Sequence, residues 1–590
     1  MKLDNVRVNG DVVTERTIKN LEAFFESNNH SPSEDHWRGI RHIAKVIEYM
    51  ANGSLASNFY ISFLPPGMGK TSTLVETVKE LGNSDYKDQG VIIFLFRLEE
   101  IDTLVGRMGL AETDYSVITS DPVLNAKGNQ HKDRARVLFT TQQQLEVRSR
   151  TGTRYTDIKA FYYRGKPRSV KIWDEATSPS VTITLNIFDL SDMWGTLHRN
   201  GLAELKTELE ALYAQLGTTL TGNFVQIPDI EKYNVGVDEA MSWFNDDKKH
   251  AVEALWSLSG RTCRVRKDQY GNNALDYDDL LPDDLAPMLI LDASGGLRNT
   301  YKLWFKGRRN LEFLHSPQKS YEGLTIHHWD RGAGKQSQTK DFESIVDGVV
   351  RTINETIPTA EEVLVIHFKK SKYIKDYETE IRKRIVDNPE RVKFCNWGRH
   401  TATNDYRDIK YVILAGVMQY NTAQYEAAGR GAKGIAKDEE LSEDEYNQTR
   451  LGEVAHHVLQ AACRGYVRNA VAGKCPEGCH LYIIFSTSER TGLPQSILNW
   501  IFPDANIENW KPIIRLKGKA LTLADMLVAE ARDGTNWRFK KSDFMAKLGL
   551  KQQQEIDRLL KHKDFMDYLA QQWVIMAHGK GEIMVGFNTR

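Results

Sequence analysis

The strongest constraint on this chain is a segment rich in glycine and proline, Leu64-Pro65-Pro66-Gly67-Met68-Gly69-Lys70-Thr71. Residues 58–63 before it are β-rich, and residues 72–81 after it have helical periodicity. The order of strand, glycine turn and helix predicts a phosphate-binding loop, because small residues let backbone N–H groups surround phosphate oxygens. A chance turn before a helix is the alternative.

In such a loop the lysine neutralises the β- and γ-phosphates and the following hydroxyl binds Mg²⁺. Leu64 stands where these loops usually have their first glycine, a departure that Pro-Pro-Gly loops commonly show. We therefore expect ATP and Mg²⁺ as cofactors, with Thr71 as a metal ligand. The predicted nucleotide-binding residues are Pro66, Gly67, Met68, Gly69, Lys70, Thr71 and Ser72.

A second motif joins an apolar strand to two carboxylates, Val170-Lys171-Ile172-Trp173-Asp174-Glu175. In an ATPase the first carboxylate binds the nucleotide's Mg²⁺ and the second orients the attacking water. We assign Asp174 to the metal and the nucleotide, and Glu175 to the water. Acidic pairs are common on surfaces, so it is the position downstream of a phosphate loop that favours the catalytic interpretation.

The length of 590 residues predicts several domains, and 41% hydrophobic with 27% charged residues is typical of globular chains. No apolar run reaches the ~18 residues of a membrane span. The N-terminus lacks a secretory signal, and five cysteines suit a reducing compartment, so we expect a cytoplasmic protein without membrane contact. With a net charge of −1, any nucleic acid must meet a local basic track.

Apolar strand patterns alternate with helical ones, which predicts an α/β fold with parallel sheets. Further buried strands are expected at Val91–Phe96, Arg136–Phe139, Val170–Trp173, Met288–Leu291, Val363–Phe368, Tyr411–Leu414 and Leu481–Phe485. Residues 35–51 predict an amphipathic helix. Residues 1–30 are polar without clear organisation, and residues 180–285 have mostly helical patterns. The glycine-spaced, acidic residues 429–447 predict a solvated, flexible loop.

With these two motifs in this order, the chain resembles a superfamily 2 DExx-box helicase over most of residues 35–490. The resemblance implies two RecA-like P-loop lobes with ATP in the cleft between them. Residues 457–468 look like the family's sixth motif, which implies catalytic roles for Gln460, Arg464 and Arg468. Guanidinium groups suit charge that spreads over several phosphate oxygens. These arginines are four residues apart instead of the usual three, which leaves open another role for one of them, and a solvated basic helix is the alternative.

Other segments resemble elements through which the family contacts nucleic acid and couples it to hydrolysis. Asp292-Ala293-Ser294 stands where the family has Ser-Ala-Thr, the element that couples hydrolysis to lobe movement. Residues 138–145 resemble a first-lobe motif whose hydroxyl and amide donors grip the backbone of the strand. A polar helix start with threonine as its N-cap is the alternative. The implied nucleic-acid contacts are Thr140, Thr141, Gln142, Lys369, Thr403 and Asn404.

The layout resembles XPD/DinG-type helicases, which carry a helical domain after the DExx box. Those enzymes usually have four cysteines for an iron–sulfur cluster before that box, whereas the first cysteine here is Cys263, so the cluster is absent. The expected domains are a polar segment at 1–30, lobe 1 at 31–315 with a helical insertion at about 180–285, lobe 2 at 316–505, and a small C-terminal domain at 506–590.

The C-terminal residues 506–590 contain 15 Lys/Arg and 10 Asp/Glu, a net charge of +5. Short helical patterns followed by a hairpin around Gly579 and Gly581 predict an α+β, winged-helix-like domain that meets phosphates. A cap packed on the second lobe is nearly as good an interpretation. Cys475 and Cys479 are either half of a zinc site or, more simply, two free thiols in a turn.

The predicted function is that of an ATP-dependent helicase or translocase on nucleic acid, with DNA favoured over RNA. Protein partners in a replication, mobile-element, phage or defence system would fit such a chain. One alternative is a motor of the viral-packaging type, although no convincing cluster of nuclease carboxylates follows residue 320. The other is a nucleotide-dependent scaffold that binds nucleic acid without unwinding it.

Overall fold

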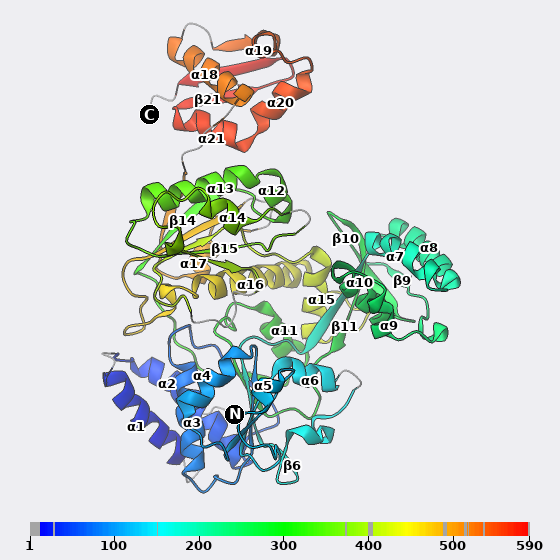
Figure 1. Cartoon of the computed structure of the whole chain (residues 1–590), viewed down its shortest axis with the longest axis vertical. Helices are drawn as coiled ribbons and strands as arrows, with labels where there is room; N and C mark the ends of the chain where they lie inside the picture. Colours follow the sequence, from blue (N-terminus) through cyan, green and yellow to red (C-terminus); the bar gives the residue numbers. More distant parts are fainter. Residues whose placement is uncertain are drawn as a thin grey trace.

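The computed structural model describes residues 12–27, 30–149, 152–371, 374–398, 405–487, 493–512, 516, 518–534 and 537–587. Figure 1 shows two α/β lobes stacked along the long axis, an insertion at the side, and a small C-terminal module at the end opposite lobe 1. No helix among the described residues is both long and apolar enough to span a membrane.

Lobe 1 is built on a seven-stranded sheet in the order β13-β1-β12-β7-β2-β4-β3, in which every pairing is parallel. Its strands are β1 (Phe59–Ser62), β2 (Val91–Leu95), β3 (Tyr115–Ile118), β4 (Val137–Thr141), β7 (Val170–Asp174), β12 (Met288–Leu291) and β13 (Leu311–Phe313). Its helices are α2 (Glu34–Ala51), α3 (Lys70–Gly82), α4 (Glu99–Met108), α5 (Pro122–Asn125), α6 (Gln142–Ser149) and α11 (Asn299–Gly307). A two-residue pair, β5 (Tyr162–Tyr163) and β6 (Lys166–Pro167), precedes β7. The predicted parallel sheet is confirmed, because helices bury both faces of its apolar strands.

The prediction of an unorganised N-terminal segment is wrong for residues 12–27. They form helix α1 (Val12–Ser27), which buries Val13, Ile18, Leu21 and Phe25 against lobe 1. Two backbone N–H groups at its start, those of Val13 and Thr14, donate to the buried Glu48 carboxylate. The apolar residues have helical spacing, but the polar residues between them hid that pattern.

Lobe 2 has a six-stranded sheet in the order β16-β15-β17-β18-β14-β19, again entirely parallel. Its strands are β14 (Leu324–Asp330), β15 (Val363–His367), β16 (Val392–Asn396), β17 (Tyr411–Leu414), β18 (Cys479–Phe485) and β19 (Asn506–Asn509). Its helices are α12 (Lys335–Lys340), α13 (Phe342–Arg351), α14 (Tyr377–Arg382), α15 (Thr422–Lys433), α16 (Glu443–Ala462) and α17 (Ile497–Ile501). Since β19 pairs with β14, the lobe extends past the expected boundary at 505.

The insertion contains helices α7 (Ile187–Arg199), α8 (Ala203–Thr218), α9 (Val237–Ser242) and α10 (Asp246–Ser257). It also contains a four-stranded antiparallel sheet in the order β8-β11-β10-β9, so the expectation of a helical domain is wrong in this respect. The strands are β8 (Ser180–Asn186), β9 (Phe224–Gln226), β10 (Thr262–Asp268) and β11 (Gly271–Asp279). Asn272 and Asn273 of β11 are buried and donate to backbone carbonyls, so the strand has no apolar run.

Residues 429–433 and 443–447 are helical, so the expected loop is wrong for them and only the connection 434–442 is a loop. Helix α15 ends at Lys433 and α16 begins at Glu443, where Ser442 and Glu445 form a capping box. Glu443, Asp444 and Glu445 therefore stabilise the positive end of a helix dipole. Asp438, Glu439 and Glu440 are exposed in the connection before it. The buried Arg430 side chain donates to three carbonyls of the connection, those of Ala436, Lys437 and Glu439.

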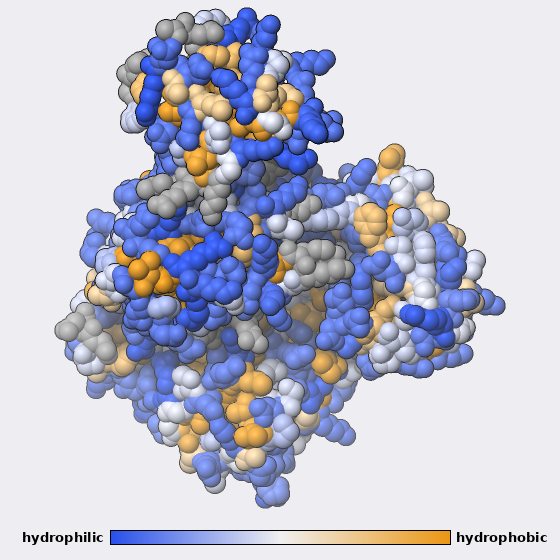
Figure 2. All heavy atoms as spheres, turned by 45° about the horizontal axis from the view of Figure 1, so that its top comes forward, coloured by the Kyte–Doolittle hydropathy of each residue, from blue (hydrophilic) through white to orange (hydrophobic). Residues whose placement is uncertain are grey.

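The C-terminal module has a three-stranded antiparallel sheet in the order β20-β22-β21. It consists of α18 (Gly518–Asp533), β20 (Arg538–Lys540), α19 (Lys541–Leu548), α20 (Gln553–Lys561), α21 (Lys563–Gln571), β21 (Val574–His578) and β22 (Glu582–Phe587). A buried ion pair between Arg331 of lobe 2 and Asp564 joins the module to the lobe. Its surface in Figure 2 is hydrophilic, with a group of exposed apolar residues on the visible face.

Candidate functional site

A cavity of about 490 Å³ lies between the two lobes. Lobe 1 lines it with the glycine-rich loop, the end of β7 and helix α4, and lobe 2 lines it with the end of α16 and the turn that follows. Helix α1 closes one side. The lining residues used below are Phe24, Phe25, Gly67, Gly69, Lys70, Thr71, Ser72, Arg97, Glu100, Arg107, Asp174, Glu175, Gln460, Arg464 and Arg468.

The loop between β1 and α3 has the backbone that phosphate binding requires. Gly67 and Gly69 have φ angles of 81° and 88°, in the left-handed region that other residues rarely adopt. A Cβ atom on Gly67 would come within 2.1 Å of the Arg468 carbonyl oxygen, so only glycine fits there. Helix α3 begins at Lys70 directly behind the loop, and its free N–H groups and dipole favour an anion.

Lys70 occupies the centre of this loop. Its Nζ atom donates to the Leu64 carbonyl oxygen at 2.5 Å. Burial lowers the pKa of Lys70 to about 8, against the opposing effect of the carboxylates of Glu175, Asp174 and Asp292. An ammonium with so little solvent around it would gain much from the negative charge of a phosphate.

Carboxylates gather opposite the loop. Burial, reinforced by the neighbouring Glu175, raises the pKa of Asp174 to about 7. Glu175 follows with a φ angle of 77°, a backbone conformation that turns it away from the course of β7. Burial and these two carboxylates raise the pKa of Glu100, on α4, to about 8. A bound cation would stabilise the charged forms of these carboxylates, and the oxygens of Asp174 and Thr71, which share the cavity, are the donors that Mg²⁺ prefers.

Helix α16 brings lobe 2 into direct contact with Glu175. The Gln460 side-chain amide donates to Glu175 Oε2 at 3.2 Å. Arg464 Nη2 donates to Gln460 Oε1 at 2.7 Å, and its Nε donates to the Gln460 carbonyl at 3.0 Å. Arg468 lines the cavity from the 3-10 turn Tyr466–Arg468. The structure thus brings together the predicted loop, the Asp-Glu pair, Gln460, Arg464 and Arg468 in one cavity.

Several cavity residues escaped the sequence analysis. Arg97, Glu100 and Arg107 come from α4 and the turn before it, and Arg107 Nη2 donates to Ser72 Oγ at 3.0 Å. Phe24 and Phe25 come from α1, which lies far from the loop in sequence. The one available signal was the position of residues 99–108 directly after a buried strand, because side chains after parallel strands meet at one edge of the sheet.

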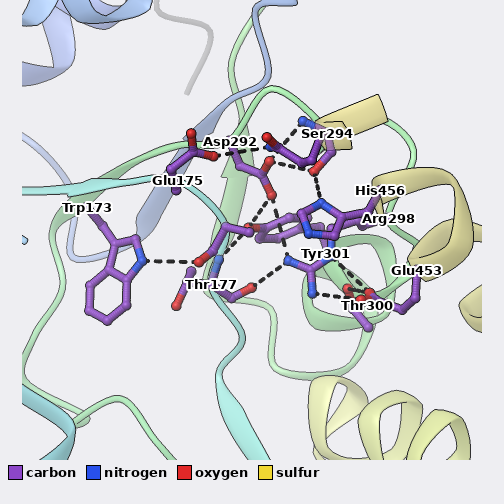
Figure 3. Close-up of polar contacts among 12 residues, drawn as sticks. Trp173, Glu175, Thr177, Asp292, Ser294, Arg298, Thr300, Tyr301, Glu453 and His456 are labelled. Atoms are coloured by element: carbon purple, nitrogen blue, oxygen red, sulfur yellow. Dashed lines mark hydrogen bonds and ion pairs between the residues drawn. The ribbon is translucent and has the colours of Figure 1, made fainter. Parts of the chain in front are cut away.

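A buried polar network connects the end of β7, the Asp292 loop and α16 (Figure 3). Tyr301 donates its hydroxyl proton to Asp292 Oδ2 at 2.9 Å and accepts the Thr177 N–H at 3.0 Å. Ser294 donates to Asp292 Oδ1 at 2.6 Å and lies 2.6 Å from His456 Nδ1. Since the serine hydroxyl has one proton, His456 Nδ1 is the donor in the second contact.

Arg298 completes this network. Its Nε and Nη2 donate to the two oxygens of Glu453 at 2.9 and 3.2 Å, and its Nη1 donates to the Thr177 carbonyl at 3.2 Å. Arg298 and Glu453 are both buried, so the pair is held without competition from water. Thr177, two residues after Glu175, is thereby tied to the same helix that carries Gln460.

The residues expected to contact nucleic acid differ in their exposure to solvent. The buried Thr140 hydroxyl donates to the Ile118 carbonyl at 2.7 Å, and the Gln142 amide donates to the Asp174 carbonyl at 2.7 Å. Both side chains are buried and bond to strands β3 and β7 of the lobe 1 sheet, and Thr141 is buried as well. Lys369 is exposed after β15. Thr403 and Asn404 lie outside the described residues, so their contacts stay a prediction.

The two thiols of the Cys475–Cys479 turn are buried, with their Sγ atoms 3.6 Å apart. Among the residues that the structure describes, no group of three or more His, Cys, Asp or Glu side chains is arranged to hold a metal ion. The interpretation as half of a zinc site therefore has no second half in the described part of the chain.

Comparisons with known proteins give structural neighbours only. No family model matches the chain, and no curated protein matches it in sequence. Xpd4 of S. tokodaii is 12% identical over 80% of this chain and 99% of its own, with a TM-score of 0.43. Dbp5 of S. cerevisiae, solved with RNA and ADP BeF3, is 10% identical over 82% of this chain and 95% of its own, with a TM-score of 0.32. Similarity at these TM-scores supports no conclusion about fold or function. The fold is described above from the sheets themselves, and the functional proposal is based on the residues of the cavity.

Proposed function

We propose that the chain is a nucleic-acid-dependent ATPase that moves along its substrate as a translocase or helicase. The observation that supports this most is the meeting of two sets of groups in one cavity: Lys70 and Glu175 from lobe 1, and Gln460, Arg464 and Arg468 from lobe 2. A site divided between two lobes can hydrolyse only when they close, so each turnover is coupled to a lobe movement.

Each side chain has a distinct role in this proposal. Lys70 leaves the Leu64 carbonyl and neutralises the β- and γ-phosphates. Glu175, oriented by Gln460, holds the attacking water. Arg464, with Arg468 beside it, stabilises the charge that develops on the transferred phosphoryl oxygens. Mg²⁺, held by Thr71 and Asp174, would neutralise charge on the phosphates. The Phe24 ring, which lines the same cavity, offers a flat apolar surface for the nucleotide's base.

The C-terminal module supports DNA as the substrate. Its element order, with β22 between β20 and β21, resembles a winged helix with one additional helix. Residues 506–590 carry a net charge of +5, and Lys547 and Lys551 are exposed on α19 and in the turn after it. Cations on such a module suit the phosphates of a duplex.

The proposal is tested by measuring ATP hydrolysis with single-stranded DNA, duplex DNA and RNA as stimulators. Lys70→Ala should lower turnover at least ~10²-fold, because it removes phosphate-neutralising charge. Lys79→Ala, on the same helix but outside the cavity, where Lys79 is half-buried and pairs with Glu76, is the matched control and should keep wild-type activity. A folded Lys70→Ala variant with normal turnover would contradict the ATPase assignment.

A second variant separates binding from chemistry. Glu175→Gln should bind ATP with near-normal affinity but accumulate the closed complex with nucleic acid, because the water is no longer activated. Loss of ATP binding would instead make Glu175 a metal ligand or a structural residue. Full ATPase activity without movement on any strand would favour the nucleotide-dependent scaffold.

A further inference from the structure

Lys319 lies in the connection between β13 of lobe 1 and β14 of lobe 2 and is only 2% exposed. Its Nζ atom donates to four backbone carbonyl oxygens. One belongs to the phosphate loop, that of Pro66 at 3.2 Å. The others belong to the arginine-bearing turn of lobe 2, those of Val467, Arg468 and Asn469 at 2.9, 3.1 and 2.7 Å.

The electrostatics of this site are unusual for a lysine. Among the described residues, its hydrogen-bond acceptors are four backbone carbonyl oxygens, which carry only partial negative charges. The ammonium has three protons to share among these four acceptors. Burial lowers the pKa of Lys319. Four carbonyl dipoles that converge on one point repel one another unless a cation lies between them. The ammonium is therefore what allows these segments to approach.

The approach itself is very close. A Cβ atom on Gly67 would come within 2.1 Å of the Arg468 carbonyl oxygen, so the backbones of the loop and the turn touch directly. Lys319 links the two segments at this contact. Its Nζ atom donates to the carbonyl oxygen of Pro66, the residue before Gly67, and to the carbonyl oxygen of Arg468. Lys319 thus contacts both the loop and the turn that carries Arg468, although it does not line the cavity.

We propose that Lys319 is a positioning residue, whose ammonium clamps the Tyr466–Arg468 turn to the phosphate loop and so sets where Arg468 meets the phosphates. The inference rests on the proposed ATPase function. Lys319 acts through Arg468 and touches no nucleotide. Its loss should raise the barrier for hydrolysis and leave nucleotide binding nearly unchanged, because Lys70 and the loop glycines are intact.

The test compares Lys319→Met with wild type, because methionine keeps the length of the stem and removes the charge. We expect kcat to fall at least ~10-fold, the scale of a catalytic group displaced by a fraction of an ångström, with KM for ATP nearly unchanged. Lys474→Met is the control, an exposed lysine of the neighbouring segment that pairs with Glu322. If Lys319→Met does not fold, Lys319→Gln, which keeps two N–H donors, is measured by the same criteria.

A double-mutant cycle with Arg468→Ala distinguishes positioning from general stabilisation. If Lys319 acts through Arg468, Lys319→Met should cause no further loss of kcat once Arg468 is alanine. Equal losses in both backgrounds, or unchanged kcat in Lys319→Met, would overturn the positioning role. Wild-type protein without ATPase activity would overturn the proposed function and this inference together, whereas an active wild type with an unaffected Lys319→Met overturns the inference alone.

Discussion

Gln460 of α16 donates its side-chain amide to the Glu175 carboxylate at 3.2 Å, and through this bond lobe 2 touches the residue that we assign to the attacking water. The same Gln460 accepts from Arg464 at 2.7 Å. Arg464, Gln460 and Glu175 therefore form one chain of hydrogen bonds across the cleft. In the proposed mechanism, this chain of bonds couples the position of α16 to the orientation of the Glu175 carboxylate, and so couples lobe closure to hydrolysis.

Gln460→Ala should lower kcat roughly 10- to 100-fold, because Glu175 loses the donor that orients it. Gln460→Glu should be at least as harmful, since a second carboxylate would repel Glu175. ATPase assays with saturating nucleic acid measure both effects. Asn447→Ala, at an exposed position of the same helix, is the control. Normal kcat in both Gln460 variants would show that the contact is incidental.

Arg464→Ala should bind nucleotide with near-normal affinity and hydrolyse it ~10³-fold more slowly, which is the scale of an arginine finger. Arg464→Lys should recover little, because one ammonium cannot contact Gln460 at two points and also meet phosphate oxygens. Nucleotide titration and single-turnover hydrolysis separate the two effects. Arg450→Ala, on the same helix but not lining the cavity, is the control. Equal single-turnover rates for Arg464→Ala and wild type would remove Arg464 from the catalytic site.

Lys547→Ala with Lys551→Ala should weaken duplex binding more than single-strand binding, and leave strand-stimulated ATPase activity intact. Each lost phosphate contact should reduce the slope of log affinity against log salt by about 0.9. Lys375→Ala, an exposed lysine of lobe 2, is the control. Unchanged duplex affinity and salt slope would make the C-terminal module a packing cap on lobe 2.

Glu100→Gln should stabilise the nucleotide-free protein, and more so at higher pH. Burial raises the pKa of Glu100 from 4.5 to about 8, so the folded wild type binds a proton that the unfolded chain releases. Wild-type stability therefore falls as pH rises from about 4.5 to about 8, on the order of 1 kcal/mol per pKa unit, whereas glutamine has no such dependence. Thermal unfolding at pH 5 and pH 9 measures the difference. Glu99→Gln, at the exposed neighbouring position, is the control. An equal effect at both pH values would contradict the shift.

The parallel sheets could be predicted because their central strands, such as β2, β7, β12 and β15, are short apolar runs bounded by turn residues. Strands β14 and β19 were missed because their sequences, LTIHHWD and NIEN, are not apolar runs. The strands of the insertion could not be predicted either, because β11 buries Asn272 and Asn273, whose amides are satisfied by carbonyls distant in sequence. Helix α1 was missed for a related reason. Its apolar residues are buried because they pack against lobe 1. The sequence of this mostly polar segment does not show that it packs against another part of the chain.

The local sequence determined the parts of the site that depend on backbone conformation. Gly67 and Gly69 are required by their positive φ angles, Lys70 begins a helix, and Asp174 with Glu175 ends a buried strand. Such features follow from short-range sterics and hydrogen bonding, which neighbouring residues specify among themselves.

Only the tertiary structure decided which distant groups meet those residues. The contacts of Gln460 with Glu175, of Lys319 with Pro66 and of Gln142 with the Asp174 carbonyl join segments that are far apart in the chain. Whether an amide in a sequence faces a carboxylate, a carbonyl or water depends on how two lobes pack. That packing is set by the burial of apolar surface over the whole molecule, and no single motif encodes it.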